Sequence, residues 1–147
     1  MPSVTDRMQQ SDLASEIEFL TARSRAIGSA IANARLAEHG LRVRAYSVLS
    51  LAAGDTQPTQ RDLAEFLRLD PSQVVSLIDG LEDQGLVKRR PDPADRRSKV
   101  IVATKKGLTV AAAARRATRD AEDEALAGLT EQERDQLRAL LRKAAFD

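Results

Sequence analysis

The sequence predicts a mainly α-helical fold that carries one small β-hairpin. Apolar residues recur with helical spacing over most of the 147 residues, and with aromatics at only 3% the core must be aliphatic and alanine-rich. The period changes after Gly85, where two short strand-like runs, residues 86–90 and 99–103, flank a segment rich in proline and aspartate. A chain of this length forms one compact domain with a real core.

Residues 11–38 are predicted to form one long helix, which ends at Gly40. Its apolar residues recur at spacings of three, four or seven: Leu13, Ile17, Leu20, Ile27, Ile31 and Ala34. So narrow an apolar stripe on so long a helix needs a partner, which is often a second chain. A second helix follows over residues 42–53.

Two short helices come next. Thr59 and Asp62 form a capping box that begins a helix over residues 60–67. Asp70 caps the following helix, in which Pro71 takes the first position, and this helix ends at Gly85. Its buried face is predicted from the helical spacing of four residues: Val74, Leu77, Ile78 and Leu81. Two short helices joined by a tight turn indicate a helix-turn-helix.

After the hairpin, Thr104 begins a long helix to about residue 127, and Thr130 with Glu133 begins a last helix to about residue 145. Residues 1–40 and 104–147 are therefore expected to form one helical bundle. Residues 41–103 are expected to form a unit inserted into it, within one compact domain.

The hairpin holds a concentration of positive charge. The formal net charge of the chain is only +1, but residues 88–99 contain six basic and two acidic side chains. Such a run can be no more than a solvated hairpin tip. Next to a helix-turn-helix, however, it favours contact with the DNA backbone.

The stretch "LAEFLRLDPSQVVSLIDGLEDQGLVKRRPDPADRRSKVIVATKKG" resembles the core of the MarR (multiple antibiotic resistance regulator) family of bacterial transcription factors. The segments Gly85-Leu86-Val87 and Asp95-Arg96-Arg97, and the start of the next helix from Thr104 to Gly107, match its pattern. The resemblance covers almost the whole chain. It implies a winged helix-turn-helix DNA-binding region, residues 41–103, inserted in a helical dimerisation region, residues 1–40 and 104–147. It also implies an obligate homodimer that binds a pseudo-palindromic DNA operator.

The resemblance also implies roles for wing residues. Arg97 is expected to enter the minor groove, where its guanidinium gains from the negative potential. Asp95 is expected to orient the tip arginines through an ion pair, and Asp79 to pair with the wing arginine and so tie the wing to the second helix of the motif. Further DNA contacts are expected from four other basic residues of the hairpin: Arg89, Arg90, Arg96 and Lys99.

The second helix of the motif, the recognition helix, presents Ser72, Gln73 and Ser76 away from its apolar stripe. Gln73 can pair with adenine, and the two serines are expected to contact phosphates. Family members often have a basic residue at positions 76 and 80, which are serine and glycine here. Affinity therefore depends unusually on the wing and on Arg61 of the preceding helix, or else the operator is read through its shape. Thr59, which caps that helix, is a further expected DNA contact.

The resemblance further implies a small aromatic effector that relieves repression. Tyr46, and with it His39, lies near the place where the family forms its ligand pocket, although a tyrosine there can also be a core aromatic with its hydroxyl at the surface. Because the chain has no cysteine, thiol-based sensing and thiolate metal sites are excluded.

Other function classes find no support in the sequence. There is no G-x-S-x-G motif, no glycine-rich phosphate loop and no catalytic pairing for the single histidine, so no enzyme activity, cofactor or metal is expected. The acidic run 120–125 is interpreted as a solvated helix face, with Arg116–Asp120 and Arg119–Asp123 pairs. No long apolar run predicts a membrane span, and a cytoplasmic location is expected. The alternative function is that of a helical dimeric adaptor whose winged unit binds protein rather than DNA.

Overall fold

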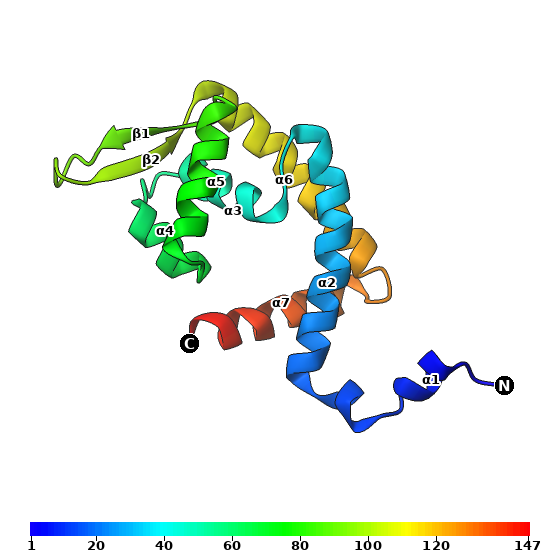
Figure 1. Ribbon diagram of the computed structural model, residues 1–147. Coiled ribbons are helices and arrows are strands. Elements are labelled where there is room, and N and C mark those ends of the chain that lie inside the picture. Colours follow the sequence, from blue (N-terminus) through cyan, green and yellow to red (C-terminus); the bar gives the residue numbers. More distant parts are fainter. The chain divides into compact units, whose positions relative to one another are not determined.

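The computed structural model describes residues 1–147, and the chain divides into two compact units. One unit contains residues 1–31 and 121–147, and the other contains residues 32–120. The elements in chain order are α1 (Val4–Met8), the 3₁₀ turn η1 (Asp12–Ser15), α2 (Ile17–Leu36), η2 (Ala37–His39), α3 (Val43–Ala53), α4 (Gln60–Leu67), α5 (Pro71–Asp83), β1 (Val87–Pro91), β2 (Lys99–Ala103), α6 (Lys105–Ala125) and α7 (Glu131–Phe146) (Figure 1). The predicted fold class, mainly helical with one hairpin, is confirmed. The division between the units lies inside α2 and α6.

The first long helix is shorter than predicted. Residues 12–15 form a separate 3₁₀ turn, and Glu16 has an extended backbone with ψ of 130°, so α2 begins only at Ile17. The polar run around this break explains it, since serine and aspartate side chains compete with helical hydrogen bonds. The Ser11 hydroxyl, for example, donates to the carbonyl of Met8 at 2.6 Å. The predicted stop at Gly40 is confirmed, because Gly40 adopts a left-handed conformation with φ of 69°, but α2 itself ends at Leu36 and the 3₁₀ turn η2 takes up residues 37–39.

The unit of residues 32–120 contains a continuous aliphatic core. Its largest fully buried side chains come from α2, α3, α4, α5, the residue before β1 and the two strands: Leu36, Val48, Leu49, Leu63, Val74, Ile78, Leu81, Leu86, Val87 and Ile101. Three of the four residues predicted to form the buried face of α5 are among them, and Leu77 is half-buried. This core fixes α5 against α3, α4 and β1.

The two helices of the helix-turn-helix begin and end as predicted. Thr59 Oγ1 accepts a hydrogen bond from the Asp62 amide at 3.1 Å, and Asp62 Oδ2 accepts one from the Thr59 amide at 2.8 Å. Helix α4 ends at Arg68, whose left-handed φ of 54° turns the chain toward α5. The Asp70 carboxylate caps α5 by accepting from the Ser72 amide at 3.2 Å.

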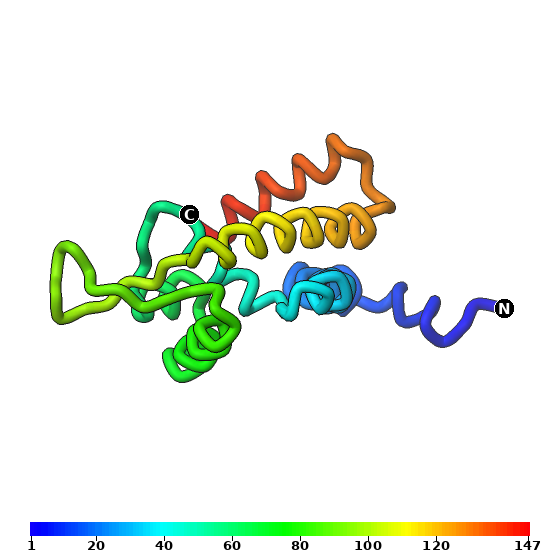
Figure 2. The backbone as a smooth tube through the Cα atoms, turned by 90° about the horizontal axis from the view of Figure 1, so that it is seen from above, coloured from blue at the N-terminus to red at the C-terminus, as the bar shows by residue number.

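Strands β1 and β2 form an antiparallel hairpin, with Val87 opposite Ala103 and Pro91 opposite Lys99. We call residues 87–103 the wing. Its tip extends away from α3, α4 and α5 in both views (Figures 1 and 2). The other edge of β2 pairs with the segment that leads into α4. There the Ile101 amide donates a hydrogen bond to the Pro58 carbonyl at 2.8 Å. The base of the wing is thereby placed beside the N-terminus of α4.

The end of the recognition helix α5 is joined to the start of α6. Thr104 Oγ1 donates to the Gly85 carbonyl at 2.6 Å and accepts from the Gly107 amide at 3.0 Å. Lys106 Nζ donates to the Gln84 carbonyl at 3.1 Å. Gly107 is buried against the backbone of Leu86, so close that a Cβ at position 107 would lie less than 3.0 Å from both the carbonyl carbon and the carbonyl oxygen.

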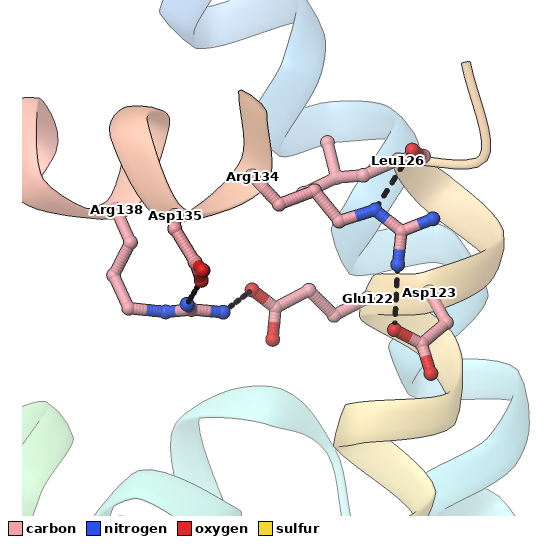
Figure 3. A network of polar contacts seen from close by, with 6 residues as sticks. All are labelled: Glu122, Asp123, Leu126, Arg134, Asp135 and Arg138. Atoms are coloured by element: carbon pink, nitrogen blue, oxygen red, sulfur yellow. Dashed lines mark hydrogen bonds and ion pairs between the residues drawn. The ribbon is translucent and has the colours of Figure 1, made fainter. Parts of the chain in front are cut away.

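The end of α6 and α7 are held together by ion pairs in the unit of residues 1–31 and 121–147 (Figure 3). Arg134 donates to Asp123 at 2.9 Å, and Arg138 contacts Glu122 at 3.3 Å and Asp135 at 2.8 Å. The pairs expected along α6, Arg116–Asp120 and Arg119–Asp123, do not form. Figure 3 shows Asp123 bound to Arg134 of α7 instead. No helix of the chain is both long and apolar enough to cross a membrane.

The capping box of α4 makes a testable contribution to acid stability. Hydrogen bonds from the Thr59 amide and then from its hydroxyl group lower the pKa of Asp62 below its ordinary value of 3.8. A carboxyl whose pKa is lower in the folded state stabilises the fold above its unfolded pKa, and this stabilisation is lost as the pH falls through the folded value. Asp62→Asn is therefore expected to be less stable than the wild type at neutral pH. The difference should shrink below about pH 4 in urea titrations; a difference independent of pH would contradict the assignment.

Candidate nucleic-acid interface

The wing and the N-terminus of α4 enclose an open groove of about 490 Å³. The backbone pairing of Pro58 and Thr59 with β2 brings these two elements together although they are about forty residues apart in the sequence. Five of the residues predicted to contact DNA line the groove: Thr59, Arg61, Arg89, Arg97 and Lys99. The structure therefore brings the predicted contacts from α4 and from the wing to one place.

Most cations of the wing are free to bind an external anion. The side chains of Arg90, Arg96, Arg97 and Lys99 are exposed, and none of them forms an ion pair within the chain. Arg61 is exposed and unpaired in the same way. Unpaired arginines that converge on one groove bind phosphate oxygens well, because the guanidinium fork matches their geometry.

The turn of the wing is built by its two aspartates. The Asp92 amide donates to the Ser98 carbonyl at 2.9 Å, and its carboxylate accepts from the Ala94 amide at 2.9 Å. Asp95 Oδ1 accepts from the Arg97 amide at 3.0 Å. The predicted ion pair between Asp95 and a tip arginine does not form, since the carboxylate binds the backbone two residues ahead, as aspartates in turns commonly do. Asp95 thus shapes the backbone and leaves the Arg97 guanidinium free.

Arg89 is the exception among the basic residues of the wing. Its guanidinium donates to Asp79 at 2.7 Å, to Glu82 at 2.8 Å and to the side-chain carbonyl of Gln60 at 3.1 Å. The wing residue that contacts Asp79 is therefore Arg89 in β1, and Arg97 at the tip makes no such pair. With three acceptors and a side chain only 20% exposed, Arg89 holds together α4, α5 and the wing. Because these three bonds occupy its guanidinium, Arg89 is less available than the other wing cations for the predicted contact with the DNA backbone.

The exposed face of α5 has a shallow depression of about 390 Å³ beside it. The predicted recognition residues Ser72, Gln73 and Ser76 line this depression together with Leu77 and Arg44. The Ser72 hydroxyl is already used, since it donates to the capping carboxylate of Asp70 at 3.1 Å. Gln73 and Ser76 are exposed and are bound to no other side chain.

Arg44 is a residue that the sequence analysis missed. It belongs to α3, and it supplies a positive charge beside a recognition helix that has none of its own. Its position beside α5 depends on the packing of α3 against α5, which no local pattern reveals.

The two residues predicted for an effector pocket lie apart from this surface. Tyr46 in α3 is half-buried and packs against the aliphatic core, which fits the simpler interpretation of a core aromatic. His39 ends the 3₁₀ turn before Gly40 and is half-buried. Neither residue lines the groove beside α4 or the depression beside α5.

The role of Arg89 predicts a contrast with its neighbour Arg90. Arg89→Ala removes three contacts between elements and should lower the free energy of unfolding by about 1–2 kcal/mol. Arg90→Ala removes an exposed, unpaired side chain, so the free energy of unfolding should change by less than about 0.5 kcal/mol. Urea denaturation of both variants measures the difference. Equal effects would show that the Arg89 contacts do not hold the wing.

The model of the MarR family matches residues 39–98. An uncharacterized HTH-type transcriptional regulator of Bacillus subtilis, YybA, is 32% identical over 57% of this chain, and the match spans 56% of that protein's length.

Two crystal structures from Rhodococcus match over almost the full length. CouR from Rhodococcus jostii RHA1, bound to p-coumaroyl-CoA, is 39% identical with a TM-score of 0.82, over 92% of this chain and 96% of CouR. A MarR-family transcriptional regulator from Rhodococcus sp. RHA1 is 35% identical with a TM-score of 0.81, over 99% and 98% of the two chains. YybA and the second Rhodococcus protein are named as transcriptional regulators, a class of proteins that is not enzymatic. The winged helix-turn-helix, the cationic groove beside it and the similarity to the Rhodococcus structures over almost the full length all indicate the same family. The chain belongs to the MarR family of transcriptional regulators.

Proposed function

We propose that this protein binds a double-stranded DNA operator in a sequence-specific way and represses transcription until an effector releases it. The observation that carries the proposal is the set of unpaired cations on the wing and α4, placed beside the exposed face of the recognition helix. An adaptor that binds protein has no need for so many free guanidinium groups at a hairpin tip. In this proposal the protein acts on DNA in the cytoplasm of a bacterium.

Each part of the surface has its own task in this proposal. Helix α5 enters the major groove, where Gln73 pairs with a base edge. Arg97 reaches into the adjacent minor groove from the wing tip. The phosphates between the two grooves are neutralised by the other free basic residues: Arg44, Arg61, Arg90, Arg96 and Lys99.

The exposed apolar side chains support a homodimer. They are concentrated in the unit of residues 1–31 and 121–147, where Ile17 is 82% exposed, Leu140 67% and Phe146 62%. Exposed apolar surface of this extent is typical of a face that a second chain covers. A twofold dimer presents two recognition helices, so the operator is expected to be pseudo-palindromic with half-sites about one helical turn apart.

The effector of this proposal is an aromatic acid, either free or as its coenzyme A thioester. Support comes from CouR, the 39% identical structure that contains p-coumaroyl-CoA. Such a ligand releases the operator only if it binds more tightly to a dimer whose recognition helices are wrongly spaced for DNA.

Selection of bound duplexes from a random pool tests the proposal. The enriched sequences should share a pseudo-palindrome, and addition of an effector should reduce the amount of bound duplex. Enrichment of no sequence at low salt would reject sequence-specific DNA binding and favour the adaptor.

A further inference from the structure

A second cationic surface lies on the unit of residues 32–120, outside the surface proposed for DNA. An open groove of about 630 Å³ runs between the C-terminal part of α3 and α6. We call it the arginine groove. Its apolar side is formed by Ala53, Leu108, Ala111 and Ala112, and its cationic side by Arg115, Arg116 and Arg119. It shares no residue with the wing groove or with the depression beside α5.

The three arginines of the groove make no ion pair with an acidic side chain of the protein. All three are exposed. Asp123, which has the helical spacing to pair with Arg119, is bound by Arg134 instead. Like charges one helical turn apart destabilise a helix slightly, so Arg115 and Arg119 carry a small cost that an anionic ligand would remove.

The shape and chemistry of the groove restrict the ligand. A volume of about 630 Å³ lies in the range of small-molecule sites, and small side chains leave the apolar side open to a flat or extended group. One carboxylate satisfies one guanidinium fork, whereas three guanidinium groups match a ligand that bears several phosphate oxygens. The groove therefore fits a molecule with an apolar chain at one end and several phosphates at the other.

We infer that the arginine groove binds the phosphate groups of an effector that is the coenzyme A thioester of an aromatic acid. The inference deepens the proposed ligand-relieved regulation and rests on it, because it selects the thioester over the free acid and gives its phosphates a site. Arg115 and Arg119, four residues apart on α6, hold the phosphates. The pantetheine arm lies along the alanine-rich side of the groove.

Calorimetric titration of the full-length protein tests this inference. The probes are p-coumaroyl-CoA and p-coumaroyl-pantetheine, which carry the same acyl group and pantetheine arm with and without the phosphorylated adenosine diphosphate part. Arg115→Gln and Arg119→Gln should each weaken binding of the CoA thioester about tenfold, as expected for loss of a charge-assisted hydrogen bond. Binding of the pantetheine thioester and of operator DNA should not change. Arg25→Gln is the matched control, because Arg25 is exposed on α2, makes no ion pair and lies outside the groove.

Four results would overturn the inference. The first is equal affinity of the variants and the wild type for the CoA thioester, and the second is an equal loss of affinity for both thioesters. The third is a changed oligomeric state of the variants in sedimentation. The fourth is no binding of the CoA thioester to the wild type. The last of these leaves operator binding intact and so rejects the thioester alone. Failure of the wild type to bind any operator is a separate result, which rejects the proposed function itself.

Discussion

Gly107→Ala is expected to destabilise the protein by about 3 kcal/mol or more. The added methyl group would lie less than 3.0 Å from the carbonyl carbon and oxygen of Leu86, and neither can rotate away as a flexible side chain could. Leu86 is itself buried and leads from the recognition helix into β1, so relief of the clash has to move α6 away from the core. Overpacking against backbone belongs to the most destabilising class of point substitutions.

Urea denaturation at fixed protein concentration measures this effect, and Gly80→Ala is the matched control. Gly80 lies inside α5, and a Cβ there would meet nothing within 4 Å. The control substitution should therefore stabilise the protein by about 0.5–1 kcal/mol, through the higher helix propensity of alanine. If both alanine variants were as stable as the wild type, the close contact between α6 and Leu86 would be wrong.

Arg97→Ala is expected to weaken operator binding by about 1–3 kcal/mol. Its guanidinium is exposed at the wing tip, unpaired, and positioned by the Asp95 turn, so its loss removes a DNA contact without disturbing the fold. The slope of log affinity against log salt should also become less steep, by about one unit. Fluorescence anisotropy with a labelled operator measures both quantities.

Two further variants separate the role of this side chain from simple charge. Arg97→Lys keeps the charge but loses the planar fork, so its affinity should lie between those of the wild type and the alanine variant. Arg25→Ala removes one charge from α2 and should leave affinity nearly unchanged. Wild-type affinity of Arg97→Ala would refute the assigned contact.

Features set by neighbouring residues could be predicted from the sequence. The capping boxes of α4 and α7, the cap of α5 and the turn around Asp92 all form as expected, because each joins groups only two to six residues apart. The same local chemistry also explains why the first long helix begins later than predicted. The polar residues before Ile17 interrupt the first helix, although the apolar spacing continues through them.

Contacts between distant residues could not be predicted in this way. Arg89 lies 29 residues from Gln60 and 10 from Asp79 in the sequence. Its contacts with both depend on the register of the strands and on the packing of the helices together. Arg44 and the arginine groove likewise follow from how α3 packs within its unit. A basic residue in the sequence can bind DNA or join elements of the fold, and only the tertiary structure separates Arg89 from Arg90.

The salt dependence of binding to the DNA upstream of the protein's own coding sequence tests the central claim most directly. If the wing, α4 and α5 of two chains contact about six to ten phosphates, log affinity should fall linearly with log salt, with a slope of about −5 to −9. Arg97→Ala should reduce the magnitude of that slope. Absence of binding at low salt, or an affinity that does not change between about 50 and 200 mM salt, would contradict the assignment of this surface to DNA.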